Sequence, residues 1–257
     1  MTGPDPRKAP RHGEGNVARF NRDVAELGGY AYSATDRLSS RLANARISAA
    51  VDKVARRVGL RGKRVLDIGC GDGSYTLELL AYEPAFLMGL EPAPLAVERA
   101  RLRAAGLSNV AFETMGIEGV DSLNEKFDVA VLRGVLHHLY DVERGIDVVC
   151  RNVDWAIVVE PNGLNPALKL LERISRYHIE HEERSFVPSR LDRMFRARGA
   201  SLESAEFLSI VPYLCPDWAA RVLDFFEPMV EALPVLNRIG CGQTVKLYRT
   251  NRAAHPS

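Results

Sequence analysis

The feature that most constrains this chain is a glycine-rich loop between an apolar run and a helical pattern. Residues 65–76 read VLDIGCGDGSYT, so an apolar run that carries Asp67 leads into the alternating glycines Gly69, Gly71 and Gly73. Glycine is used where the backbone turns tightly or approaches a ligand closely. Ligands of open α/β sheets bind where a strand ends and a helix begins. The sequence therefore predicts a site for a nucleotide-like cofactor at this loop.

The spacing of the glycines separates two kinds of cofactor loop. The dinucleotide fingerprint G-x-G-x-x-G would need its third glycine at position 74, which is Ser74. The chain instead reads D-x-G-x-G-x-G from Asp67 to Gly73, which closely resembles the first motif of the class I S-adenosylmethionine (SAM)-dependent methyltransferases. An acid at the strand end suits the cationic amino group of SAM, and bare backbone suits its methionine and ribose portions.

A second acid follows at a suitable distance. Residues 86–90 predict a buried strand that ends in Glu91 and Pro92. An acid about 20 residues beyond the glycine loop, at a strand end, is placed to accept hydrogen bonds from ribose hydroxyls. The alternative is that Glu91 only caps the helix expected to start near Pro94, because acids favour the first turn.

The resemblance continues through two further expected strands, at 109–114 and 127–132. The second leads into RGVLHHL at 133–139, which is similar to the LHHL segment common in small-molecule methyltransferases. Many relatives place an adenine-binding aspartate where this chain has Gly116. This departure implies that adenine is held by backbone around Gly116 and Ile117, or by Glu118.

The resemblance implies SAM as cofactor and S-adenosylhomocysteine as product. The residues expected to hold the cofactor are Asp67, Gly69, Cys70, Gly71, Glu91, Pro92, Gly116, Ile117 and Arg133.

The candidate catalytic residues are His137 and His138, which follow the fourth expected strand. The sulfonium of SAM is intrinsically electrophilic, so the protein mainly has to align an acceptor and exclude water. A histidine would help by taking a proton from a hydroxyl acceptor near neutral pH. The alternative is that both histidines only begin a helix and are satisfied by backbone.

No metal site is expected. His178 and Glu182 share one helical face, but the segment does not match the H-E-x-x-H pattern of zinc enzymes. The four cysteines are widely spread and contain no C-x-x-C pair, which argues against a zinc site or a secreted disulfide framework.

The alternation of strand and helix patterns to about residue 160 predicts an α/β fold with a parallel, helix-covered sheet. The fifth strand is expected at 155–159. The family resemblance implies a Rossmann-like, mostly parallel seven-stranded sheet with helices on both faces. It also implies an antiparallel C-terminal hairpin, which we assign to residues 201–211 and 242–249.

The domain organisation follows from composition and pattern. Residues 1–15 are rich in proline, glycine and charge, which predicts a disordered tail. Residues 16–60 predict an N-terminal helical cap, and 61–257 the SAM-binding domain. An apolar helical insertion is expected at about 212–241. Ordinary core packing, a wall over an apolar acceptor and a dimer surface are the three interpretations of this insertion.

Charge and hydropathy limit the partners. The net charge of +1 and the pI near 7.7 give no basic field for nucleic acid or an anionic membrane. An N-terminal apolar segment typical of secretion and an apolar run of about 18 residues are both absent, so we expect a cytoplasmic protein without a membrane span.

These observations favour a SAM-dependent methyltransferase that acts on a small, apolar or aromatic acceptor at oxygen, nitrogen or carbon. A homodimer remains an option. One alternative is an NAD(P)-dependent oxidoreductase, which Ser74 opposes. The other alternative is a non-catalytic SAM-binding partner subunit.

Overall fold

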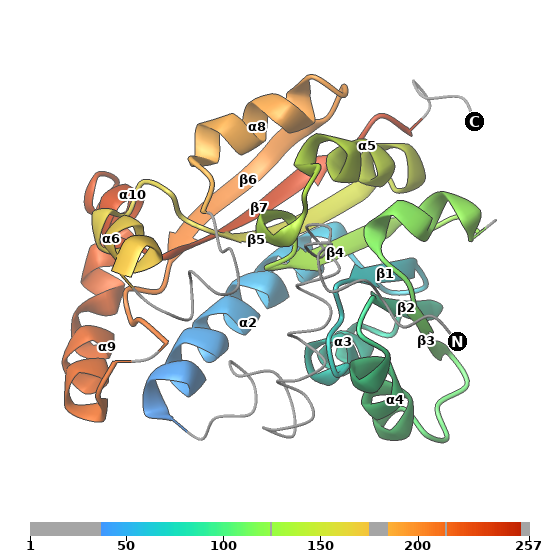
Figure 1. Cartoon of the computed structure of the whole chain (residues 1–257), viewed down its shortest axis with the longest axis horizontal. Helices are drawn as coiled ribbons and strands as arrows, with labels where there is room; N and C mark the ends of the chain where they lie inside the picture. Colours follow the sequence, from blue (N-terminus) through green and yellow to red (C-terminus); the bar gives the residue numbers. More distant parts are fainter. Residues whose placement is uncertain (1–36, 124, 175–184, 214, 253–257) are drawn as a thin grey trace, which may run out of the picture.

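A computed structural model describes residues 37–123, 125–174, 185–213 and 215–252 (Figure 1). The expected tail at 1–15, the first part of the expected cap at 16–36 and the pair His178 and Glu182 lie outside these residues. The described strands are β1 (Arg64–Ile68), β2 (Phe86–Glu91), β3 (Val110–Thr114), β4 (Val129–Arg133), β5 (Trp155–Pro161), β6 (Ser201–Leu208) and β7 (Gln243–Arg249).

The seven strands form one sheet in the order β3-β2-β1-β4-β5-β7-β6. Strands β1 to β5 run parallel to one another, whereas β7 runs antiparallel to both β5 and β6. The order reverses at β1, so the carboxyl ends of β1 and β4 flank the switch point where α/β sheets bind ligands. The predicted fold class, including the antiparallel C-terminal pair, is confirmed.

Helices cover both faces of the sheet (Figure 1). The described α-helices are α2 (Leu38–Val58), α3 (Ser74–Glu78), α4 (Pro94–Arg103), α5 (Val142–Asn152), α6 (Pro166–Ile174), α8 (Pro188–Arg196), α9 (Asp217–Ala232) and α10 (Leu236–Gly240). Short 3₁₀ turns are η1 (Leu79–Tyr82), η2 (Ile117–Ser122) and η3 (Leu136–His138). One face packs against α5 and α8, and the other packs against α2.

Successive side chains of β1 point alternately into the two apolar clusters, one on each face of the sheet. Leu66 and Ile68 point into the cluster under α5 and α8, whereas Val65 points into the cluster under α2. Both faces are buried, which explains why the central strands read as continuous apolar runs rather than alternating ones. Asp67 lies on the same strand and is buried as well.

The C-terminal strand β7 carries an internal ion pair against α8. Lys246 is almost fully buried and its Nζ lies 2.5 Å from Oδ1 of Asp192, which also accepts a hydrogen bond from the Tyr248 hydroxyl at 2.7 Å. Burial lowers the pKa of Lys246. The Tyr248 ring stacks on Phe195 with centroids 3.9 Å apart. These contacts fasten α8 to the sheet.

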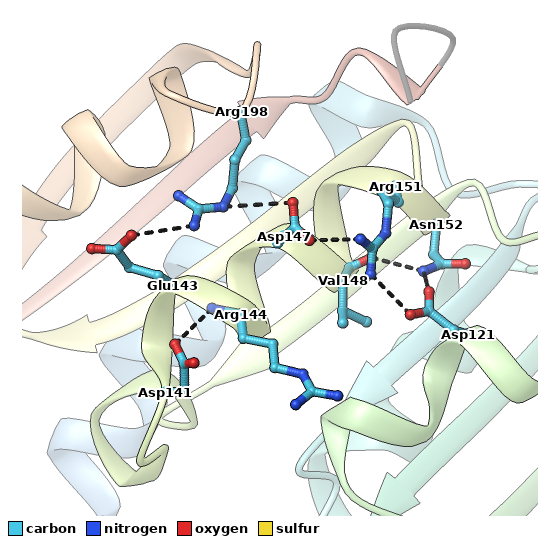
Figure 2. A network of polar contacts seen from close by, with 9 residues as sticks. All are labelled: Asp121, Asp141, Glu143, Arg144, Asp147, Val148, Arg151, Asn152 and Arg198. Carbon is cyan, nitrogen blue, oxygen red and sulfur yellow. Dashed lines mark hydrogen bonds and ion pairs between the residues drawn. The ribbon is translucent and has the colours of Figure 1, made fainter. Parts of the chain in front are cut away.

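The outer surface of α5 carries a chain of ion pairs (Figure 2). Arg198 lies 3.4 Å from Glu143 and 3.8 Å from Asp147. Arg151 lies 2.6 Å from Asp147 and 2.9 Å from Asp121. The network joins α5 to η2 and to the end of α8. Exposed pairs of this kind contribute about 0.2–1 kcal/mol each, so the network is secondary to the apolar core.

One strand ends earlier than predicted. The sequence predicts a strand to residue 211, but β6 ends at Leu208. Ser209 has φ +62°, outside the extended region, and its N–H donates to Oε1 of Glu231 instead of to a neighbouring strand. Within the described residues, no helix combines the length and apolar character needed to cross a membrane.

Candidate functional site

A cavity of about 990 Å³ opens at the carboxyl ends of the parallel strands. Its volume lies at the upper end of the roughly 300–1,000 Å³ typical of small-molecule sites. Every residue that the sequence predicts for cofactor binding or catalysis lines it: Asp67, Gly69, Cys70, Gly71, Glu91, Pro92, Gly116, Ile117, Arg133, His137 and His138.

The glycine loop has the backbone conformation that its sequence predicts. Gly69, Gly71 and Gly73 have φ values of +72°, +55° and +77°. A Cβ on Gly69 would lie 2.5 Å from Cγ2 of Val135, so the loop packs directly against the segment that follows β4. Glycine is needed at Gly69 both for its positive φ and for this close approach.

Asp72 holds the loop in place. Its Oδ1 accepts hydrogen bonds from the Ser74 N–H at 3.2 Å and the Ser74 hydroxyl at 2.7 Å. Its Oδ2 lies 2.9 Å from Nη2 of Arg103 on α4. Sequence reasoning missed this pair. The Asp-x-Ser spacing is a signal of the local turn, whereas nothing local points to Arg103.

Asp67 is a buried acid beside the loop. Its Oδ2 accepts a hydrogen bond from the Thr76 hydroxyl at 2.5 Å. Burial raises the pKa of Asp67 to about 7, against the opposing effects of Thr76 and of the nearby Arg133. A cation placed at this carboxylate would favour its charged form.

Glu91 connects the loop to the end of β2. Its Oε2 accepts the Gly71 N–H at 3.2 Å, and its Oε1 accepts the Ala93 N–H at 2.9 Å. The N-cap residue of α4 is Ala93, and the helix receives no side-chain cap. Glu91 therefore does not cap α4, and its buried carboxylate lines the cavity instead.

The remaining residues predicted to bind the cofactor differ in burial and in their packing partners. The Cys70 side chain packs in a buried cluster with Val97, Ala100, Ala104 and Phe112, and burial raises the pKa of its thiol. The Cys70 side chain therefore packs against α4 and β3. Ile117 is buried, whereas Pro92 is exposed. A Cβ on Gly116 would lie 2.9 Å from Oε2 of Glu118, which also lines the cavity.

Arg133 joins β4 to α2. Its Nη1 donates to the Ser48 hydroxyl at 3.0 Å, and its Nη2 donates to Oδ1 of Asn44 at 3.2 Å. The guanidinium lies over the Tyr75 ring, 3.6 Å from its centroid, in a cation–π contact. Sequence reasoning did not predict the contacts of Asn44, Ser48 and Tyr75 with Arg133, because Arg133 lies far along the chain from all three.

Glu160, at the end of β5, holds the turn that carries both histidines. Its Oε1 accepts the N–H groups of Val135 at 3.1 Å and Leu136 at 2.7 Å. Its Oε2 lies 2.8 Å from Nδ1 of His137, and the carboxylate is 1% exposed. The rings of His137 and His138 lie 3.9 Å apart at 44°. In the sequence, Glu160 is recognisable only as an acid at the end of an expected strand, and its bonds to the turn and to His137 are not predicted.

The cavity is also lined by residues 209–213, which α2 and α9 fix in place. The hydroxyls of Ser39 and Ser40 donate to the Tyr213 carbonyl at 2.7 and 3.1 Å. Glu227 of α9 accepts the Ile210 N–H at 2.7 Å and Nε of Arg46 at 3.1 Å. Burial raises the pKa of Glu227.

Two asparagines connect the segment after β5 to the end of α10. Asn162 donates from Nδ2 to the carbonyls of Arg238 and Cys241, both at 2.8 Å. Asn165 donates to the Gly240 carbonyl at 2.8 Å. Buried polar groups that are paired in this way keep a wall rigid, so this side of the cavity is preformed.

Residues 40–205 match the family model described as a methyltransferase domain. The chain belongs to this family. Methyltransferases of the Rossmann-like class use SAM as methyl donor, so the chain carries a SAM-dependent methyltransferase domain. The oxidoreductase alternative is wrong.

Two relatives of this methyltransferase carry different names. A tRNA U34 carboxymethyltransferase of Desulfotalea psychrophila is 37% identical over 81 residues, which cover 31% of this chain and 25% of the relative. A ubiquinone biosynthesis O-methyltransferase of Neisseria meningitidis serogroup C is 30% identical over 169 residues, covering 58% of this chain and 68% of the relative. The chain therefore spans only about a quarter of the carboxymethyltransferase.

Solved structures share the methyltransferase fold at low identity. One is a SAM-dependent methyltransferase, named as a possible histamine N-methyltransferase, from Thermotoga maritima. It has a TM-score of 0.63 at 18% identity, covering 92% of this chain and 100% of that one. Another is magnesium protoporphyrin IX methyltransferase from Synechocystis, with a TM-score of 0.60 at 15% identity and coverage of 84% and 89%. At these identities the likeness shows the fold.

A metal centre finds no support in the part of the chain that the structure describes. Among those residues, no group of three or more histidine, cysteine or acidic side chains is arranged to hold a metal ion.

Proposed function

We propose that this methyltransferase transfers the methyl group of SAM to a small molecule with an apolar or aromatic body. The observation that carries the proposal is a cavity lined by two different sets of residues, which we call its cofactor half and its acceptor half. One half contains the glycine loop and the strand-end acids. The other half is lined by apolar side chains, among them Leu168, Leu171, Ile210, Val211 and Ile239.

The cofactor half fits SAM in charge and shape. We assign the amino group of SAM to Asp67, because a cation at this site relieves the cost of a buried carboxylate. Glu91 is assigned to the ribose hydroxyls, and Gly116 with Ile117 to adenine. Gly69 has no side chain, so the backbone of the loop packs closely against Val135 at the edge of the cavity. When bound, SAM supplies a methyl group on a positively charged sulfur.

The acceptor half fits a largely apolar ligand. Pockets of this kind bind by burying apolar surface, and a few polar groups fix the orientation of the ligand. Here Tyr213 and Gln243 supply such groups. The walls that contain residues 209–213 and α10 are held by the bonds of Glu227 and Asn162, so they present a fixed shape. Such walls align an acceptor and exclude water from the transfer.

For a hydroxyl acceptor, His137 and His138 are the candidate proton acceptors. Because the carboxylate of Glu160 accepts a hydrogen bond from Nδ1 of His137, the neutral ring carries its proton there. Nε2 is then the basic nitrogen of His137. Fixing the tautomer in this way is how a neighbouring carboxylate orients a histidine base.

The acceptor class is supported by charge as well as by the cavity. A net charge of +1 gives the chain no overall excess of positive charge for binding a phosphate backbone. The carboxymethyltransferase relatives named for tRNA match only a part of their own length.

We also place the reaction in the cytoplasm, where the four free cysteines remain reduced.

A methyl-transfer screen tests the proposal. Purified protein is incubated with methyl-labelled SAM and with phenols, amines, carboxylic acids or bulk tRNA, and transferred label is counted. We expect label on a small molecule with an apolar or aromatic body. Label on tRNA alone would contradict the acceptor class. Calorimetric binding of SAM without transfer to any acceptor would support the non-catalytic partner subunit instead.

A further inference from the structure

An apolar surface covers the outer side of α9, the loop after it and α10. We call it the α9 face. Among the described residues, nine of the seventeen large apolar side chains that are exposed fall within this short stretch. Its members are Trp218, Val222, Phe225, Phe226, Met229, Leu233, Val235, Leu236 and Ile239. Phe225 is 78% exposed and Trp218 is 72% exposed. Concentrated apolar exposure of this kind marks an interaction site rather than ordinary surface.

The fold itself orients this surface outward. The buried residues of α9 are Ala220 and Glu227, seven positions apart on the opposite side of the helix. Glu227 is fixed there by the Ile210 N–H and by Arg46 of α2. Rotating α9 to bury its apolar side would break both hydrogen bonds and remove the Glu227 carboxylate from its buried position. Of the three interpretations of this insertion, ordinary core packing does not fit the exposure of these side chains.

The spacing along the helix is that of a helix–helix seam. Trp218, Val222, Phe225 and Met229 follow one another at intervals of four, three and four residues. This is the a/d spacing with which one helix packs against another. Ala220 and Glu227 show that α9 meets its own chain with its other side. A partner that presents a matching apolar seam would complete the packing.

We propose that a second copy of this chain covers the α9 face, with the two α9 helices packed against each other about a twofold axis. In a twofold dimer the same patch occurs on both sides, so each seam meets an identical seam. Asp217 and Arg221, which carry opposite charges, are exposed beside the α9 face. The chain's net charge of +1 opposes pairing only weakly.

The size of the α9 face agrees with a dimer. An aromatic side chain has a surface of about 150–250 Å², so the three on the α9 face together expose roughly 400 Å² of surface. The six aliphatic members bring the total close to the roughly 800 Å² per partner of a standard interface. Ile239 belongs to the α9 face and also lines the cavity, so the dimer covers the α10 edge of the site.

The first test is the molecular mass of the full chain by light scattering across a concentration series. We expect the wild type to have twice the 28.5 kDa chain mass at high concentration, and Phe225→Asp to have the mass of one chain. Leu102→Asp is the matched control, because Leu102 is 71% exposed on α4, outside the α9 face. It should remain dimeric. Circular dichroism confirms that both variants are folded.

Hydrogen exchange on the full chain separates the possible occupants. Protection of α9 amides that rises with protein concentration supports the second copy. Protection that is independent of concentration would mean that another part of the same chain covers the α9 face, and would overturn the proposal. A wild type that is monomeric throughout, a Phe225→Asp variant that stays dimeric, or a monomer that binds phosphatidylcholine vesicles through α9 would overturn it as well.

Discussion

Nδ1 of His137 lies 2.8 Å from Oε2 of Glu160, while the other oxygen of the same carboxylate binds the backbone N–H groups of Val135 and Leu136. One buried acid on β5 therefore fixes both the turn after β4 and the ring orientation of a histidine in the cavity. This coupling is possible because β4 and β5 are parallel neighbours whose carboxyl ends meet at the same edge.

The first prediction concerns Glu160→Gln. A glutamine keeps an acceptor for the two N–H groups but presents its NH₂ to His137, which moves the ring proton from Nδ1 to Nε2. If His137 is the base, we expect kcat for a hydroxyl acceptor to fall by about 10²-fold or more, with KM little changed. Kinetics and ¹⁵N NMR of the ring nitrogens measure the two effects.

Glu98→Gln is the control for this variant, since Glu98 is exposed on α4 and does not line the cavity. It should leave the His137 tautomer and kcat unchanged. An altered tautomer in Glu160→Gln with an unaltered kcat would exclude His137 as the base and leave His138 as the candidate.

The second prediction concerns the pH dependence of SAM binding. Burial raises the pKa of Asp67 to about 7, so in the ligand-free protein its carboxylate is largely protonated below that pH. Because the cationic amino group of SAM favours the charged carboxylate, affinity should increase as the pH rises from about 6 to 8. Calorimetry across this range in the wild type and in Asp67→Asn provides the comparison. The same slope in both proteins would remove Asp67 from the amino-group site.

The third prediction concerns Gly69→Ala. The substitution forces an alanine to φ +72° and places its Cβ 2.5 Å from Val135, so we expect a loss of about 1–3 kcal/mol in the free energy of unfolding and weaker SAM binding. Denaturant unfolding and calorimetry measure both.

Gly106→Ala separates the effect of backbone strain at a positive φ from the effect of a steric clash with a neighbouring side chain. Gly106 has φ +88° but nothing within 4 Å of the added Cβ. This variant should lose stability through strain alone and keep its affinity for SAM. Adding Val135→Ala to Gly69→Ala should recover part of the lost stability, and no recovery would show that the contact with Val135 is not the cause.

The fourth prediction concerns Arg133→Lys. A lysine cannot reproduce the forked donation to Ser48 and Asn44, so we expect a loss of about 1 kcal/mol in stability and faster amide exchange around these two residues of α2. Arg57→Lys, at an exposed position near the end of the same helix, is the control and should change neither quantity. Equal exchange rates in the two variants would mean that Arg133 does not anchor α2.

The sequence by itself determined the sheet class, the glycine loop and the strand-end acids. These are local properties: Gly69 and Gly71 report a backbone conformation, and Asp67 and Glu91 stand at the ends of recognisable strands. Strand boundaries depend on more than the local pattern, since β6 stops where Ser209 takes a positive φ and binds Glu231, a residue of a later helix.

Only the tertiary structure decided which side chains hold these parts together. Glu160 and His137 are separated by 23 residues, and Arg133 and Ser48 by 85. The direction of α9 was likewise undetermined, because its apolar spacing suits a core as well as an interface. The burial of Glu227 against Ile210 settled that the apolar side faces outward. The periodicity of a sequence shows that a helix has an apolar and a polar side. Which side packs against the rest of the protein depends on contacts that form only when the chain folds.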